Sequence, residues 1–168
     1  MSLGLLDQCR SELDREIGVT RRVLRLVPGS RLTWSPHPRS MTLGRLATHV
    51  AALPGWLPHI LDAPSFDLSA VPADQPDDPR LELILARFED GAAAARRALA
   101  GSTDARLVET WTLLDDGQTV LTAPRIVVLR TEGLYHLTHH RGQLTVYLRL
   151  LDVPVPPIYG PTADEGRL

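Results

Sequence analysis

The chain has 168 residues, 43% of them apolar and 23% charged, which is ordinary for a globular domain. Its formal net charge of −2 gives no electrostatic basis for binding nucleic acid or an anionic membrane. The single cysteine excludes an intrachain disulfide and a thiolate metal cluster, and the absence of lysine excludes Schiff-base chemistry.

The first predicted element is an amphipathic helix over residues 5–27. Its apolar residues recur at three- and four-residue spacings, and Pro28-Gly29 ends it. A proline-rich connection containing Trp34 follows.

A second helix begins after a cap at Ser40 or Thr42 and carries His49 on its apolar row. Proline removes a backbone donor and clashes with the preceding turn. Pro54 and Pro58 therefore predict a kink or break about one turn after His49.

Residues 62–79 are rich in proline and predict a long crossover loop without regular structure. A third amphipathic helix is expected over residues 79–100, because its apolar positions keep a helical register up to Gly101-Ser102.

A β-hairpin is predicted next. Residues 108–114 and 118–122 are strand-like and flank Asp116-Gly117, a strong two-residue turn signal. Pro124 then suits the first turn of a fourth helix that runs to about Asp152.

Four amphipathic helices with a long crossover predict an all-α fold, a four-helix bundle with a short β-hairpin before the last helix. We expect one domain over residues 1–168, in which residues 154–168 form an extended, proline-rich tail. No basic segment followed by an apolar run is present, and no apolar stretch could span a bilayer, so we expect a cytoplasmic protein.

The most informative feature is a cluster of histidines in the last helix. His136 and His140 are four residues apart, so they share one face of a helix. Two imidazoles one turn apart can hold a single divalent cation. Both residues also lie on the apolar row of this helix, as His49 does on the second helix.

Three imidazoles are therefore expected to point into the interior of the bundle. A neutral imidazole has one N–H and one lone pair, and both need partners when buried. A metal ion bound by His49, His136 and His140 satisfies the three lone pairs together. The alternative is three separate histidines, each bonded to a carbonyl or hydroxyl group, and we favour the metal.

The sequence leaves the roles of two neighbouring residues, His139 and Glu132, undecided. His139 lies about 60° around the helix from His136, so it is expected beside the ligands or on the surface, and a His136/His139 pair is not excluded. Glu132, one turn before His136, is expected either to orient an imidazole or to be solvated.

Three neutral ligands leave the ion with its full charge and an open coordination position, the pattern of a catalytic site. The glutamate that serves as general base in zinc proteases is missing, because Leu137 and Thr138 follow His136. A zinc-protease mechanism is therefore not expected.

The run His136-Leu-Thr-His-His-Arg-Gly-Gln-Leu144 resembles the DinB family of damage-inducible bacterial proteins. So do Pro156-Pro-Ile-Tyr-Gly-Pro161, Ser40-Met-Thr-Leu-Gly-Arg-Leu-Ala-Thr-His49 and Leu53-Pro-Gly-Trp56. The similarity extends from about residue 5 to residue 165. It departs at Tyr135, where many relatives have asparagine.

The resemblance implies a four-helix bundle in up-down-down-up order, which is often a homodimer. It implies a zinc or nickel ion on His49, His136 and His140. Arg141 and Gln143 match the family's Arg-Gly-Gln, and we expect them to make structural hydrogen bonds around the site.

Characterised relatives include transferases and an isomerase that use low-molecular-weight thiols such as bacillithiol or mycothiol. We therefore expect a metal-dependent, thiol-dependent S-transferase that acts on a small molecule. Metal-assisted hydrolysis is the alternative reaction. A non-catalytic, metal-binding protein of the stress response or an interaction module is the alternative class.

Overall fold

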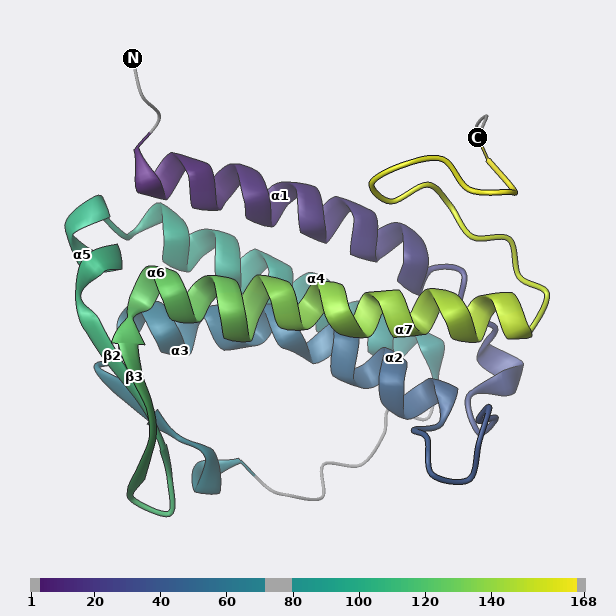
Figure 1. The fold of residues 1–168 in the computed structure, drawn as a ribbon, viewed down its shortest axis with the longest axis horizontal. Helices are drawn as coiled ribbons and strands as arrows, with labels where there is room; N and C mark the ends of the chain where they lie inside the picture. Colours follow the sequence, from purple (N-terminus) through teal and green to yellow (C-terminus); the bar gives the residue numbers. More distant parts are fainter. Residues whose placement is uncertain (1–3, 72–79, 166–168) are drawn as a thin grey trace.

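Helices form most of the structure, and a small sheet lies at one end (Figure 1). The computed structural model describes residues 4–71 and 80–165. The helical elements are α1 (Leu5–Leu24), η1 (Gly29–Arg31), α2 (Leu43–Ala52), η2 (Leu53–Trp56), α3 (Leu57–Asp62), η3 (Leu68–Ala70), α4 (Leu81–Ala100), α5 (Asp104–Val108), α6 (Arg125–Val128), η4 (Leu129–Tyr135) and α7 (His136–Leu150).

The core lies between α1, α2, α4 and α7. Helices α1 and α2 each pack against both α4 and α7, so that the four enclose a common apolar interior. Its largest fully buried apolar side chains include Phe88, Leu13 and Ile17. The prediction of a mostly helical fold is confirmed, and the up-down-down-up order stays a prediction.

The second predicted helix is interrupted as expected. Thr42 caps α2, because its hydroxyl accepts a hydrogen bond from the Arg45 N–H at 3.1 Å. The α-helix ends at Ala52, and the tighter turn η2 begins with Leu53-Pro54. A second α-helical piece, α3, follows with Pro58 in its first turn.

The last helix differs from a continuous α-helix. It begins after Pro124, as predicted, but residues 129–135 form the π-helical segment η4 immediately before His136. The i→i+5 hydrogen bonds of a π-helix change the direction in which the following side chains point. A prediction that assumes 3.6 residues per turn throughout misses this change. Gly133 lies in this segment against Leu57, where an added Cβ would be 3.2 Å from a methyl carbon.

The predicted hairpin is confirmed as β2 (Thr110–Asp115) and β3 (Gln118–Pro124), which pair antiparallel. Asp116 and Gly117 both have positive φ, at 48° and 72°. Positive φ at both central residues is the requirement of the tight turn that matches strand twist.

The crossover is not entirely a loop, and this prediction was wrong in part. Residues Ser65–Asp67 form β1, which pairs parallel with β2 and gives a three-stranded sheet of order β1-β2-β3. The Asp67 carboxylate accepts hydrogen bonds from the backbone of Asp116 and Gly117, which ties the crossover to the hairpin turn. Residues 72–79 of the predicted crossover lie outside the described residues.

The C-terminal segment is irregular, as predicted, but it is tied down. Val155 is buried, and its N–H donates to the Asp164 carboxylate at 2.9 Å. The same carboxylate accepts from the Arg149 guanidinium at 3.1 Å. Residues 166–168 of the predicted tail lie outside the described residues.

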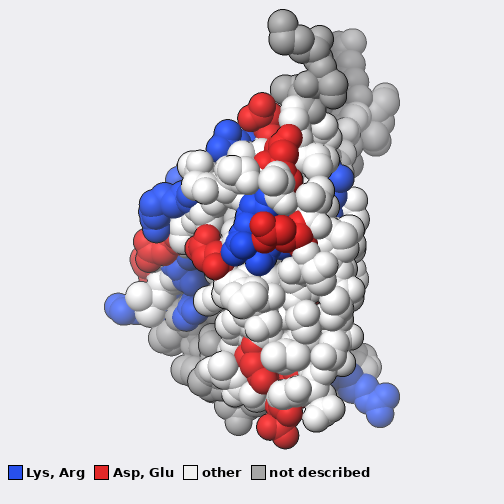
Figure 2. Space-filling view, turned by 90° about the vertical axis from the view of Figure 1, so that its left-hand side faces the viewer, with Lys and Arg blue, Asp and Glu red and all other residues white. Residues whose placement is uncertain are grey.

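Within the described residues, no helix is both long and apolar enough to cross a lipid bilayer. Figure 2 shows the end of the molecule with α5 and the sheet, where acidic and basic side chains are interspersed among uncharged ones.

A buried arginine joins the sheet end to the helices. Arg125, 1% exposed at the start of α6, donates to the carbonyl oxygens of Ile60 and Ala63, the latter at 2.6 Å. The Glu109 carboxylate lies 3.8 Å from its Nε. The side chain therefore satisfies two carbonyls near the end of α3.

Replacing Arg125 by methionine should lower the free energy of unfolding by about 2 kcal/mol, because both carbonyls lose their donor. Urea denaturation measures this loss. Arg97→Met, at an exposed position of α4, is the matched control and should change stability by less than about 0.5 kcal/mol. Equal denaturation midpoints for the two variants would contradict the structural role of Arg125.

Candidate metal centre

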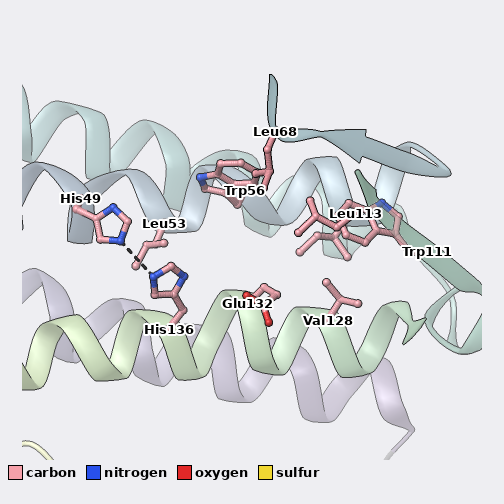
Figure 3. A pocket seen from close by; sticks show the side chains of 10 residues that line it. His49, Leu53, Trp56, Leu68, Trp111, Leu113, Val128, Glu132 and His136 are labelled. Carbon is pink, nitrogen blue, oxygen red and sulfur yellow. Dashed lines mark hydrogen bonds between the residues drawn. The ribbon is translucent and has the colours of Figure 1, made fainter. Parts of the chain in front are cut away.

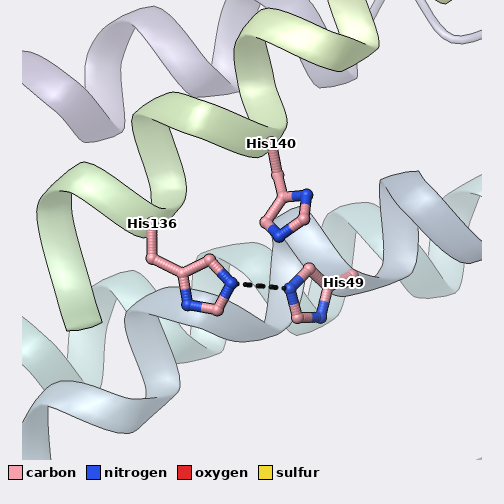
Figure 4. Close-up of side chains that lie close together, drawn as sticks. All are labelled: His49, His136 and His140. Carbon is pink, nitrogen blue, oxygen red and sulfur yellow. Dashed lines mark hydrogen bonds between the residues drawn. The ribbon is translucent and has the colours of Figure 1, made fainter. Parts of the chain in front are cut away.

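Two helices that are distant in sequence bring three imidazoles together (Figure 4). His49 lies near the end of α2, while His136 begins α7 and His140 follows one turn later. Because α2 packs directly against α7, the three side chains converge between the two helices. All three are half-buried, so the cluster lies at the edge of the apolar interior rather than within it.

The ligand atoms are close enough to share one ion. The Nε2 atoms of His49 and His136 are 3.2 Å apart, and the candidate nitrogens of all three rings lie within 4.8 Å of one another. A tetrahedral ion with metal–nitrogen bonds of about 2.0–2.1 Å separates its nitrogens by about 3.3 Å. The His49–His136 pair already has this separation.

A neighbouring amide determines which nitrogen of His140 is available. The Gln143 side-chain oxygen lies 2.7 Å from His140 Nδ1. Since an amide oxygen only accepts, Nδ1–H donates to it and the lone pair is on Nε2. Metal-ligating histidines commonly donate their second N–H to such a partner, which fixes the ring orientation.

The surroundings of His49 and His140 favour the neutral imidazole, which metal ligation requires. Burial lowers the pKa of His49, and repulsion from the other two imidazoles and from Arg45 lowers it further, to about 4. Burial also lowers the pKa of His140, although its hydrogen bond to Gln143 opposes this effect.

The donor set fits a divalent transition metal. Three neutral imidazole nitrogens suit zinc, copper, iron or nickel, whereas magnesium and calcium prefer oxygen ligands. Among the described residues, this trio is the group of histidine, cysteine or acidic side chains close enough to hold an ion. Three protein ligands leave a position for a further molecule.

The other predicted site residues occupy different places. His139 is exposed and packs edge-on against His140, with ring centroids 4.9 Å apart. Glu132 is exposed at the rim of a cavity that His136 also lines. Gln143 contacts His140 as described above.

Arg141 does not approach the histidines. Its guanidinium, 1% exposed, forms an ion pair with Glu16 of α1 at 2.6 Å and donates to Thr20 and to the Tyr159 hydroxyl. It therefore joins α7 to α1 and to the C-terminal segment. The expectation of structural hydrogen bonding fits this position, but its partners lie on a different face of α7 from the histidines.

Sequence reasoning missed the cavity beside the histidines. Figure 3 shows it between η2, the sheet and α6, with His49 and His136 at one end and Trp111 and Leu113 at the other. The one sequence feature that could have indicated the cavity is the predicted hairpin. Side chains alternate between the two faces of a strand, so Trp111 and Leu113 share one face of β2.

The low pKa of His49 predicts a pH-dependent stability of the metal-free protein. Above pH 6.5 this imidazole is neutral in both states; between pH 6.5 and 4 the unfolded chain binds a proton that the folded chain does not. The free energy of unfolding should therefore decrease as the pH is lowered from 6.5 to 4. The contribution of His49 is about 2 kcal/mol after allowance for its partial exposure.

Urea denaturation with a chelator at pH 7 and pH 4 tests this, with His49→Gln as reference. Carboxylates titrate equally in both proteins, so the difference isolates His49. The wild type should lose more stability than the variant on acidification. Parallel pH profiles would show that burial of His49 does not oppose its protonation.

Comparison with known proteins identifies the family and agrees with the fold. The family model described as "DinB family" matches residues 6–167. An uncharacterized protein of Bacillus subtilis, YrdA, is 28% identical over 161 residues, which cover 95% of this chain and 91% of YrdA.

Two solved structures share the fold. A DinB-like protein from Bacillus cereus has a TM-score of 0.66 at 24% identity, covering 87% of this chain and 92% of its own. A DinB-like protein from Bacillus subtilis, YjoA, has a TM-score of 0.70 at 16% identity, covering 91% and 98%. The match to the family model over nearly the whole length shows that this chain belongs to the DinB family.

Proposed function

We propose that the protein is a metal-dependent transferase that joins a low-molecular-weight thiol to a small electrophile. The observation that supports this most directly is the convergence of three imidazoles, with the Nε2 atoms of His49 and His136 only 3.2 Å apart. A neutral ligand set leaves the charge of the ion undiminished, which favours binding of an anionic thiolate.

The residues around the site support such a role. Gln143 holds the His140 ring with Nε2 towards the other imidazoles. The low pKa of His49 keeps that ring available as a ligand well below neutral pH. A bound zinc or nickel ion would lower the pKa of a coordinated thiol and so supply the nucleophile.

We also propose the details that the family resemblance implies. The ion is zinc or nickel, the assembly is a homodimer, and the protein acts in the cytoplasm in the stress response. Its domain is a single bundle in up-down-down-up order.

Purified protein should contain a single zinc or nickel ion per chain. The double variant His136→Ala/His140→Ala should lower metal affinity by about 100-fold or more, because it removes two of three ligands. Elemental analysis after dialysis measures occupancy.

His139→Ala is the matched control for this measurement, since His139 is exposed on the same helix. It should retain the occupancy of the wild type. Full occupancy in the double variant, or an equal loss in the control, would refute the triad.

The metal-loaded protein should accelerate the reaction of a small thiol with 1-chloro-2,4-dinitrobenzene. The thiolate sulfur forms a bond to the ring carbon, chloride leaves with the electron pair of the broken bond, and the thiol proton passes to solvent. Thioether absorbance gives the rate, with mycothiol and bacillithiol as the thiols. His136→Ala should abolish the acceleration and His139→Ala should retain it.

Metal-loaded protein that accelerates neither thiol would contradict the transferase. Cleavage of a nitrophenyl ester by the same preparation would then favour metal-assisted hydrolysis. Stoichiometric metal without either reaction would favour a non-catalytic metal-binding protein.

A further inference from the structure

We infer that the cavity beside the histidines is a substrate chamber for a small molecule with an uncharged, apolar body. This inference rests on the proposed function, because it assigns the electrophile that the thiol would attack. The cavity has a volume of about 260 Å³ and opens between η2, α3, the sheet and α6.

The walls of the chamber are apolar over most of their extent. Seven of its ten lining residues are aliphatic or tryptophan, and they come from five different elements. Trp56 of η2, Leu68 of η3 and Leu113 of β2 are half-buried, so their side chains are accessible to a ligand. Val128 of α6 and Ile60 of α3 also line the chamber and are buried.

The histidines of the chamber are at one end. His49 and His136 lie towards α2 and α7, Glu132 lies along the wall between the two ends, and Trp111 and Leu113 lie at the far end (Figure 3). A ligand in this chamber therefore has room for a polar group next to the imidazoles and the Glu132 carboxylate, whereas the far end takes an apolar group. The remainder of the molecule contacts apolar side chains.

The far end offers no partner for a charge. The indole N–H of Trp111 already donates to the His59 carbonyl at 3.2 Å. No arginine is among the described residues that line the chamber, although the chain has 18 basic residues. The nearby guanidinium of Arg125 is directed to backbone carbonyls. A charged group buried there would lose its hydration without compensation.

The size of the chamber limits the ligand to a small molecule. An apolar protein cavity of about 150 Å³ holds a benzene molecule. The chamber has room for such a ring and a short chain that reaches the histidines. We therefore assign an aromatic or compact aliphatic body with one polar or reactive group at the metal end.

Isothermal titration calorimetry with three alcohols tests this assignment. The alcohols differ in whether they carry an aromatic ring and whether that ring carries a charge. They are 4-phenyl-1-butanol, 1-butanol, which lacks the ring, and 4-(4-hydroxybutyl)benzoate, which carries a charge at the far end. The phenyl compound should bind at least about tenfold more tightly than either of the others. Equal affinities for all three, or no binding of the phenyl compound, would overturn the inference.

Two variants locate the binding. Leu113→Trp and Leu68→Trp fill the chamber from different elements and should each weaken binding of the phenyl probe by about tenfold or more. Val120→Trp is the matched control, because Val120 is 58% exposed on β3 and does not line the chamber. The inference would be overturned if a folded Leu113→Trp or Leu68→Trp variant bound the phenyl probe with wild-type affinity. It would also be overturned if Val120→Trp lost as much affinity as these two variants.

The phenyl probe is titrated separately into metal-free and into zinc-loaded protein. The proposed chamber and the proposed metal site can then be refuted independently of each other. Phenyl-probe binding by protein that takes up no metal would sustain the chamber and refute the transferase. Full metal occupancy without phenyl-probe binding would refute the chamber and leave the metal site intact.

Discussion

The ion pair between Arg141 and Glu16 fixes the rotation of α7 about its own axis, and the position of His136 and His140 depends on that rotation. The two groups are 2.6 Å apart, and the arginine is almost entirely buried. Successive residues of a helix are about 100° apart, so holding Arg141 against α1 turns the preceding residue, His140, towards α2. Other rotations of α7 are disfavoured, because separating a buried ion pair leaves a buried charge unpaired.

The C-terminal segment completes this anchor. The hydroxyl of Tyr159 donates to the Glu16 carboxylate at 2.8 Å and accepts from Arg141 at 2.6 Å. The segment is therefore part of the polar network that positions α7. Arg125 has a comparable role at the other end of the same helical run, where it holds the start of α6 against the end of α3. The π-helical segment lies between these two fixed points, directly before His136.

The features that the sequence predicted well are local. Helix periodicity located the four helical segments, the Asp116-Gly117 turn located the hairpin, and Pro54 located the break after His49. The features it missed depend on contacts between distant segments. Strand β1 has no strong pattern of its own and forms because β2 offers a free edge and Asp67 binds the hairpin turn. The Arg141 side chain likewise contacts α1 rather than the histidines because it pairs with Glu16, which is 125 residues away.

The break in the second helix connects the histidine cluster to the adjacent cavity. A continuous helix would carry the residues after His49 along the same straight axis. Because Pro54 ends the regular hydrogen bonding, the chain tightens into η2 and then restarts as α3. Trp56 comes to lie over the cavity and Ile60 lines its wall, within the same few turns that supply a histidine to the cluster. The prolines that interrupt this helix therefore place an apolar surface beside the three histidines, because the same few turns supply His49, Trp56 and Ile60.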